Sequence, residues 1–219
     1  MSRPKRKQDL ALVLLSGGLD SAVALYWAIS KNLESLAFTF TYPLQTKKER
    51  RASFRIAKSA GCRIQKTHVG FLKEIGDISE AGRAKLGKRT PLSYIPSRNL
   101  IFYGIASSVA EVIGAKYIVG GHNSEDSRVF PDASGTFFRE FNRLTKTGLI
   151  TGAETGRVVL PLARLSKAKV IELGQTLQVP FHLTWSCYKD GKKPCEKCSA
   201  CRLRSRAFRE AGVSDPLVS

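Results

Sequence analysis

Apolar residues gather along the chain in short, nearly continuous runs that alternate with stretches of helical spacing. The pairs are 10–15 ("LALVLL") with 21–30, 35–42 ("SLAFTFTY") with 47–61, and the helical stretch 94–115 leading into 116–121 ("KYIVGG"). Runs that are apolar along their whole length are typical of parallel strands buried on both faces. Their alternation with helices predicts an α/β fold built on a doubly wound, mostly parallel sheet.

Local signals place several ends and loops. Gly61 and Gly114 each follow a helical stretch and are predicted to end it. Residues 165–179 are predicted to be helical, with Ser166 as the N-cap. Residues 70–95 lack periodicity and are expected to form a long loop or cover, and 122–157 should begin as a loop and then turn helical.

The length of 219 residues suits one domain with a small appendage. We divide the chain into an α/β domain, 1–182, and a cysteine-rich tail, 183–219, packed on the same domain. No apolar stretch approaches the ~18 residues that cross a bilayer. The N-terminus has no apolar core of the signal-peptide type. We therefore expect a cytoplasmic protein without membrane contact.

Basic residues are in large excess, because 36 Lys and Arg against 18 Asp and Glu give a net charge of +18. They cluster at 3–7, 47–58 and 189–209. Such an excess attracts phosphate-rich partners, although a solvated basic surface is the simpler interpretation. A weak nucleic-acid contact through this surface stays open, as does a homodimer.

Four of the five cysteines lie close together near the C-terminus, at Cys187, Cys195, Cys198 and Cys201. Two overlapping CxxC pairs bring three thiolates to one point, and the fourth completes a tetrahedron. We predict one structural zinc ion per chain, although an iron–sulfur cluster uses similar spacings. A closed site leaves no open coordination position, so no catalytic role is expected. The fifth cysteine, Cys62, is expected to be a small buried residue.

The segment "SGGLDS", Ser16–Ser21, follows the first predicted strand. It is not a Walker A loop, because no Gly-Lys-Ser/Thr follows. Its glycines allow close backbone approach, and the next helix would present free N–H groups to an anion. Asp20 fits beside phosphates only with a Mg²⁺ ion between them. The alternative is an ordinary strand–helix turn capped by Asp20 or Ser21, and the residues alone leave both open.

SGGxDS after an N-terminal strand resembles the signature of the PP-loop enzymes, the N-type ATP pyrophosphatases. Four further segments resemble the 7-cyano-7-deazaguanine synthases in order and spacing, at 95–106, 120–132, 160–174 and 183–208. The resemblance implies a ligase that uses two ATP molecules and ammonia to turn 7-carboxy-7-deazaguanine into the 7-cyano compound, a precursor of queuosine or archaeosine. ATP would be split into AMP and pyrophosphate.

The resemblance also implies site residues. The nucleotide-binding segment is Leu15, Ser16, Gly17, Gly18, Leu19, Asp20, Ser21, Ala22, Val23, Ala24 and Leu25. Asp20 is expected to place Mg²⁺, Arg98 to neutralise charge on the phosphates or the substrate carboxylate, and Asp132 to accept hydrogen bonds from the guanine-like edge. Of the three histidines, only His122 is expected to line the pocket.

Two segments depart from the bacterial members of that family. Residues 42–49 read "YPLQTKKE" where those members carry YGQ, a basic residue and His, and Ala133 and Ser134 replace Cys-Arg. Two other functions would account for parts of the sequence. A PP-loop enzyme that modifies tRNA or another substrate would usually need a catalytic cysteine pair, which Cys62 lacks. A non-catalytic zinc-tail module that binds nucleic acid would leave "SGGLDS" without a purpose.

Overall fold

The protein is described by a computed structural model covering residues 8–42, 45–72, 74 and 94–218. Most of the expected loop at 70–95 lies outside the described residues. Within these residues the sheet has five parallel strands in the order β3-β2-β1-β4-β5. The strands are β1 Leu10–Leu14, β2 Glu34–Thr41, β3 Ile64–His68, β4 Tyr117–Val119 and β5 Arg157–Val159.

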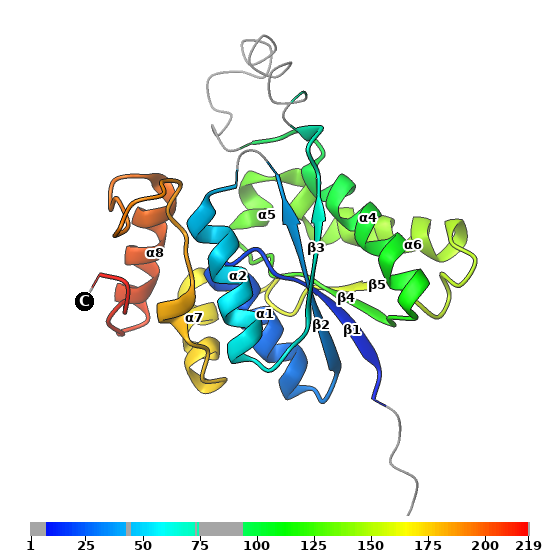
Figure 1. The fold of residues 1–219 in the computed structure, drawn as a ribbon, viewed down its shortest axis with the longest axis horizontal. Coiled ribbons are helices and arrows are strands. Elements are labelled where there is room, and N and C mark those ends of the chain that lie inside the picture. The colour runs from blue at the N-terminus through cyan, green and yellow to red at the C-terminus, as the bar shows by residue number, and fades with distance from the viewer. Residues whose placement is uncertain (1–7, 43–44, 73, 75–93, 219) are drawn as a thin grey trace, which may run out of the picture.

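Helices cover both faces of the sheet (Figure 1). One face carries α1 Leu19–Ser30, α2 Lys47–Ser59, α7 Lys167–Thr176 and α8 Ser199–Glu210. The other carries α4 Arg98–Ile113 and α6 Gly135–Gly148. Short turns complete the described chain, at α5 Asp126–Val129, η1 Pro131–Ala133 and η2 Phe181–Leu183. The doubly wound parallel fold predicted from the strand–helix alternation is confirmed.

The central strand β1 explains why its sequence is apolar throughout. Leu12 packs into the apolar cluster under α4 and α6, whereas Ala11 and Val13 pack into the cluster under α1, α2, α7 and α8. All three side chains are fully buried. A strand covered on both faces has no solvent side, so no polar alternation is needed.

The chain order creates a crevice beside β1. From β1 the chain passes to β2 and β3 on one side, then returns to β4 on the other, with Val13 opposite Val119. The loops that leave the carboxyl ends of β1 and β4 therefore run to opposite sides. Ligands of open α/β sheets bind at such a switch point.

Several predicted helix ends are confirmed. Gly114 ends α4 with φ of 67°, and Gly61 follows α2 with the same φ, a conformation that glycine adopts without strain. The Ser166 side chain accepts a hydrogen bond from the Lys169 N–H, as an N-cap should. The segment 122–157 begins with loops and short turns and then forms α6. Among the described residues, no helix is both long and apolar enough to cross a membrane.

The cysteine-rich tail packs on the α1 side of the sheet. Trp185, Cys187, Cys201 and Phe208 belong to the same apolar cluster as helix α1. Within the tail, Arg204 forms a buried ion pair with Asp215 at 2.7 Å and also donates to the Thr184 hydroxyl. The boundary at 182/183 stays a prediction about how the chain divides.

Candidate active site and metal centre

The loop after β1 is shaped by its own hydroxyl groups. The Ser16 and Ser21 hydroxyls lie 3.1 Å apart, the Gly18 N–H donates to Ser16 Oγ, and Ser21 Oγ donates to the Gly18 carbonyl. Helix α1 begins at Leu19 with Gly18 as its N-cap, and no side chain caps it. The capped-turn alternative with Asp20 or Ser21 is therefore wrong. The helix N-terminus, with its positive dipole end, faces the crevice as an anion site requires.

Gly17 allows this loop to lie against α2. Its φ is 98°, which disfavours other residues. A side chain at this position would also overlap the Glu49 carbonyl oxygen and come within 2.9 Å of the Ser53 nitrogen. Gly18 differs, because its φ is −77° and the nearest atom to an added Cβ is Ser16 Oγ at 3.3 Å. The two glycines thus have different roles.

Asp20 points from the loop toward two later segments. Its carboxylate accepts from Lys167 Nζ at 2.7 Å and from Asn123 Nδ2 at 3.2 Å. The loop after β4 comes just as close, since a Cβ on Gly121 would lie 2.8 Å from the Asp20 backbone. Asp20 therefore joins three segments that are far apart in the sequence.

Lys167 is surrounded by carboxylates. Burial would lower the pKa of Lys167, but the negative charges of Asp20, Asp126 and Glu125 outweigh burial and hold it above the ordinary value. Burial and the charge of Asp20 raise the pKa of Asp126. Glu125 accepts from the Lys167 backbone N–H and pairs with Arg206 of α8. Three carboxylates face the ammonium group of Lys167 and the guanidinium of Arg206, so this corner of the crevice keeps a negative charge that suits a further cation.

Arg98 and Asp132 meet at the start of α4. The Asp132 carboxylate accepts from the Asn99 N–H at 3.1 Å, and the Asn99 side chain returns a bond to the Asp132 carbonyl. One oxygen of Asp132 is therefore engaged in capping the helix that carries Arg98. The Arg98 guanidinium lies against the Tyr42 hydroxyl at the end of β2.

His122 lies among all three residues predicted to be catalytic. Burial lowers its pKa to about 4, Asp132 and Asp20 oppose this shift, and Arg98 reinforces it. The ring packs 5.2 Å from Phe138 and 5.8 Å from Tyr103. The imidazole is therefore neutral at neutral pH. That His122 lines a binding pocket stays a prediction.

Glu49, on the first turn of α2, is a site residue that the sequence did not reveal. Burial raises its pKa to about 7, against the opposing effects of Arg98 and the Thr46 N–H. Thr46 Oγ1 in turn accepts from the Glu49 N–H, so the two residues form a capping box. Burial and the nearby Glu49 also raise the pKa of Tyr42 to about 12. The region around Glu49, Tyr42 and Arg98 is thus poor in solvent and holds a carboxyl group with a pKa of about 7.

The four clustered cysteines converge as predicted. Their sulfur atoms all lie within 4.8 Å of one another, and Cys195 Sγ and Cys201 Sγ are 3.9 Å apart. A tetrahedron with Zn–S bonds of ~2.3 Å has edges of about 3.8 Å, so the thiols fit this ion. Backbone N–H groups of Cys198 and Lys197 lower the pKa of Cys195 to about 6. Cys62 lies elsewhere, and burial raises its pKa.

The tail also directly touches the loop Ser16–Ser21, which we call the phosphate loop because the helix N-terminus that follows it suits an anion. The Trp185 N–H donates to the Gly17 carbonyl at 2.9 Å. The indole Nε1 of Trp185 is buried without a hydrogen-bond partner among the described residues. Lys48 Nζ lies 5.4 Å from the centre of the Trp185 ring. The segment around Trp185, just before the first cysteine of the cluster, therefore packs against the Ser16–Ser21 loop.

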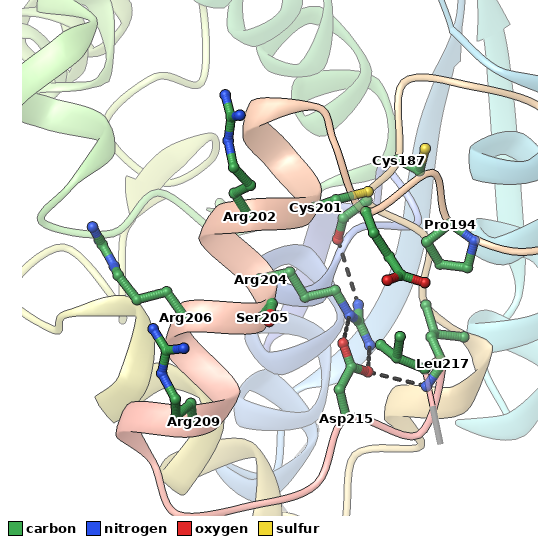
Figure 2. Close-up of a pocket in the computed structure, with 13 residues that line it drawn as sticks. Cys187, Pro194, Cys201, Arg202, Arg204, Ser205, Arg206, Arg209, Asp215 and Leu217 are labelled. Carbon is green, nitrogen blue, oxygen red and sulfur yellow. Dashed lines mark hydrogen bonds and ion pairs between the residues drawn. The ribbon is translucent and has the colours of Figure 1, made fainter.

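A cavity of about 420 Å³ lies beside α8 (Figure 2), and none of its lining residues belongs to Ser16–Ser21. The Arg204–Asp215 ion pair and the sulfur atoms of Cys187 and Cys201 border it. The side chains of Arg202, Arg206 and Arg209 leave α8 on the side away from Asp215 (Figure 2). The position of this cavity relates it to the tail and not to the crevice of the sheet.

Comparison with known proteins gives the family. The sequence model described as "Queuosine biosynthesis protein QueC" matches residues 10–212. The chain belongs to this family. Among curated QueC relatives, the 7-cyano-7-deazaguanine synthase of Thermoplasma acidophilum is 39% identical over 94% of this chain and 90% of its own length. The synthase of Chlorobium phaeovibrioides is also 39% identical, over 94% and 95%.

Solved structures share the fold at low sequence identity. The NMN synthetase of Francisella tularensis has a TM-score of 0.53 at 17% identity, covering 96% of this chain and 81% of its own. The U34-tRNA thiolase NcsA of Methanococcus maripaludis has a TM-score of 0.52 at 16% identity, covering 93% and 66%. These likenesses support the PP-loop type of fold for this member of the QueC family.

Proposed function

We propose that the protein is an ATP-dependent ligase that converts 7-carboxy-7-deazaguanine and ammonia into 7-cyano-7-deazaguanine. The observation that carries the proposal is the match to the QueC family along residues 10–212, with synthases 39% identical over 94% of the chain. The uncapped helix at the end of β1 supports it physically, because the reaction must hold a departing pyrophosphate.

The first half of the reaction makes an amide. A substrate carboxylate oxygen attacks the α-phosphate of ATP, the bond to the β-phosphate breaks, and pyrophosphate leaves. The N–H groups of the loop and the ammonium group of Lys167 are suited to bind its charge. Arg98 is proposed to offset charge as the acyl adenylate forms. Ammonia then attacks the acyl carbon, AMP leaves, and the nitrogen gives up one proton.

The second half turns the amide into a nitrile. The amide oxygen attacks a second ATP, pyrophosphate leaves, and loss of AMP with both N–H protons gives the triple bond. These steps need a proton acceptor close to the substrate. Glu49 is proposed as this acceptor, because a pKa of about 7 leaves it partly ionised at neutral pH. His122, whose pKa is lowered to about 4, stays neutral and is proposed to accept a hydrogen bond from the substrate and not its proton. The oxygen of Asp132 that does not cap α4 is proposed to contact the purine-like edge.

Two metal ions belong to the proposal. Zn²⁺ would be held by Cys187, Cys195, Cys198 and Cys201 and would fix the tail beside the loop. Mg²⁺ would be held by Asp20 and Asp126 with the phosphates of ATP, whose negative charge it would offset. Both carboxylates already lie within the charge network of Lys167.

The deciding experiment incubates the protein with ATP, Mg²⁺, an ammonium salt and 7-carboxy-7-deazaguanine. Mass spectrometry should show the nitrile, and two AMP should form for each nitrile. Asp20→Asn should reduce turnover sharply without unfolding the protein. Arg98→Ala should lower kcat more than it raises KM, since charge compensation counts most as the adenylate forms. ADP in place of AMP, or an unconsumed carboxylate, would refute the assignment.

A further inference from the structure

The outer face of α2 carries a stripe of exposed side chains that are almost all positively charged. The stripe consists of Lys47, Arg50, Arg51, Phe54, Arg55 and Lys58. The spacing is that of one helix face. Phe54, the single uncharged member, is 38% exposed. The opposite face buries Ala52 and Ile56 in the core. Glu49, the acidic residue of α2, is not part of the stripe.

This arrangement is unfavourable for the helix alone. Lys47 and Arg51, and Arg51 and Arg55, are like charges four residues apart, a spacing that destabilises helices. None of the five cations of the stripe takes part in an ion pair among the described residues. Elsewhere, one exposed cation of α6 and one of α7 are paired within their helix, as Arg143–Glu140 and Lys169–Glu172. Asp190 of the tail is an acidic neighbour of Lys47 and Arg51 at the start of the stripe, and five cations against this one carboxylate leave the stripe strongly positive.

A second basic segment is fixed against the start of this stripe. The Asp190 carboxylate accepts from the backbone N–H groups of Lys47 and Lys48 at 3.0 and 2.8 Å. These two bonds lower the pKa of Asp190. They hold the tail loop 188–197 beside α2. The loop exposes a further set of side chains, namely Tyr188, Lys189, Lys192, Lys193 and Lys197. We call the α2 stripe and this loop together the basic face.

We propose that the basic face binds single-stranded nucleic acid. Its cations match a phosphate backbone, and the release of counterions from that backbone would supply the affinity. Its exposed aromatic rings, Phe54 and Tyr188 at 38% and 54% exposure, match unpaired bases that stack on side chains. The net charge of +18 adds long-range attraction for such a polyanion.

A lipid surface fits the same face less well. A helix that lies on a membrane inserts its apolar face between the lipids. The apolar face of α2 is already used, since Ile56 and Ala57 are fully buried in the core. Only Phe54 would be left to insert. A single-stranded nucleic acid would contact both kinds of exposed side chain on the basic face. Its phosphates would bind the long cationic side chains, and its bases would stack on the aromatic rings.

The test measures fluorescence anisotropy of a short labelled single-stranded RNA with the full-length, metal-loaded protein over a range of salt. The variant Arg51→Gln/Arg55→Gln/Lys58→Gln removes three positive charges. Glutamine is a good helix former, so the substitutions should keep α2 helical. Each phosphate contact on a single strand contributes ~0.7 to the slope of log affinity against log salt. The slope should therefore flatten by about 2, and affinity at moderate salt should fall by at least about tenfold. Phe54→Leu should weaken binding by about fivefold or more and leave the slope unchanged.

The matched control removes the same charge from the opposite face of the sheet. The triple Arg139→Gln/Arg143→Gln/Lys146→Gln lies on α6, on the other side of the sheet from α2 (Figure 1). All three side chains are exposed. This triple should keep the parent slope. A single-stranded DNA of the same length is run beside the RNA, and tight binding to either supports the proposal.

Three results would overturn it. The first is equal weakening by both triples, which would mean that only the overall charge acts. The second is no binding to RNA or DNA at moderate salt, and the third is binding to phosphatidylserine vesicles without binding to oligonucleotides. Circular dichroism checks that the α2 triple is folded. If it is not, Lys189→Gln/Lys192→Gln/Lys193→Gln on the tail loop provides the same measurement.

Discussion

The phosphate loop and the cysteine tail are built in opposite ways. The loop is one contiguous segment whose shape depends on backbone conformation, serine hydroxyls and the absence of side chains at Gly17. The tail brings four side chains together around a position suited to a metal ion. Backbone sites are fixed by close packing, whereas a thiolate site depends on the ion that its ligands share. The two regions should therefore fail for different reasons.

The two regions are nevertheless in contact through α2. Gly17 lies against the first turns of that helix, and Asp190 from the tail accepts hydrogen bonds from its N-terminus. Trp185 adds a direct hydrogen bond from the tail to the Gly17 carbonyl. Substitutions in the tail and in the phosphate loop therefore distinguish the stability that depends on the metal ion from the stability that depends on packing.

The largest effect is expected from Cys198→Ser. Metal binding is coupled to folding at such sites, with apparent free energies of about 10 kcal/mol or more in isolated zinc fingers. The variant should lose its zinc, and the amides of residues 187–201 should exchange with deuterium far faster, while β1 and β4 stay protected. Elemental analysis and hydrogen exchange measure both. Cys62→Ser is the control and should keep its zinc; iron or no metal in the parent protein would contradict the assignment.

The next largest effect is expected from Gly17→Ala. The added methyl group would overlap the Glu49 carbonyl oxygen, and φ of 98° disfavours alanine. The free energy of unfolding should fall on the order of 4 kcal/mol, and ATP binding should be lost with the loop shape.

Gly18→Ala is the matched control for the loop. Its φ of −77° suits alanine, and the nearest atom to the new Cβ is the Ser16 hydroxyl at 3.3 Å. Urea unfolding should show a change below about 1 kcal/mol. Equal losses from the two substitutions would mean that close packing against α2 does not shape the loop.

The same contrast explains what the sequence could and could not predict. "SGGLDS" and the cysteine spacing are local patterns, so the loop, the sheet type and the convergence of four thiols were all predictable. The sequence shows that Gly17 can adopt backbone conformations that other residues disfavour, but its contact with Glu49 depends on how α2 packs. Local patterns report conformation, and packing decides which distant residues meet.

Lys167 shows most clearly what could not be predicted about the site from the sequence alone. Its segment was part of the family resemblance, yet only the Ser166 cap could be interpreted from the local pattern. Its 2.7 Å contact with Asp20 joins residues 147 positions apart. Glu49 was hidden in a basic cluster, although Thr46 three residues earlier gave the signal of a capping box. A single sequence contains no local sign that either side chain faces the crevice.

A smaller and pH-dependent effect is expected from Glu49→Gln, on the helix that joins the two regions. The folded-state pKa of about 7 lies above the ordinary value of 4.5, so the folded protein holds this proton more tightly than the unfolded chain. The contribution of protonated Glu49 to the free energy of unfolding is fully present below pH 4.5 and is lost as the pH rises through 7. Relative to the parent, the variant should gain stability over that range, by about 2 kcal/mol after allowing for partial contact with water.

Urea unfolding at a series of pH values measures the difference between parent and variant. Glu140→Gln, on the exposed surface of α6, is the control and should give a flat difference. A flat difference for Glu49→Gln as well would show that the carboxyl group is not held in a solvent-poor environment.

The smallest effect, and the most direct test of contact between the two regions, is expected from Asp190→Ala. The change removes two hydrogen bonds to the start of α2 but leaves all four cysteines in place. Stability should fall only slightly, because the carboxylate is exposed and Thr46 still caps the helix. ATP affinity, measured by calorimetry, should weaken a few-fold, since the first turn of α2 supports Gly17. Ser134→Ala removes the cap of α6 on the opposite face of the sheet and should cost about 1 kcal/mol without changing ATP affinity. If both variants leave ATP binding unchanged, the tail and the loop are neighbours that act independently.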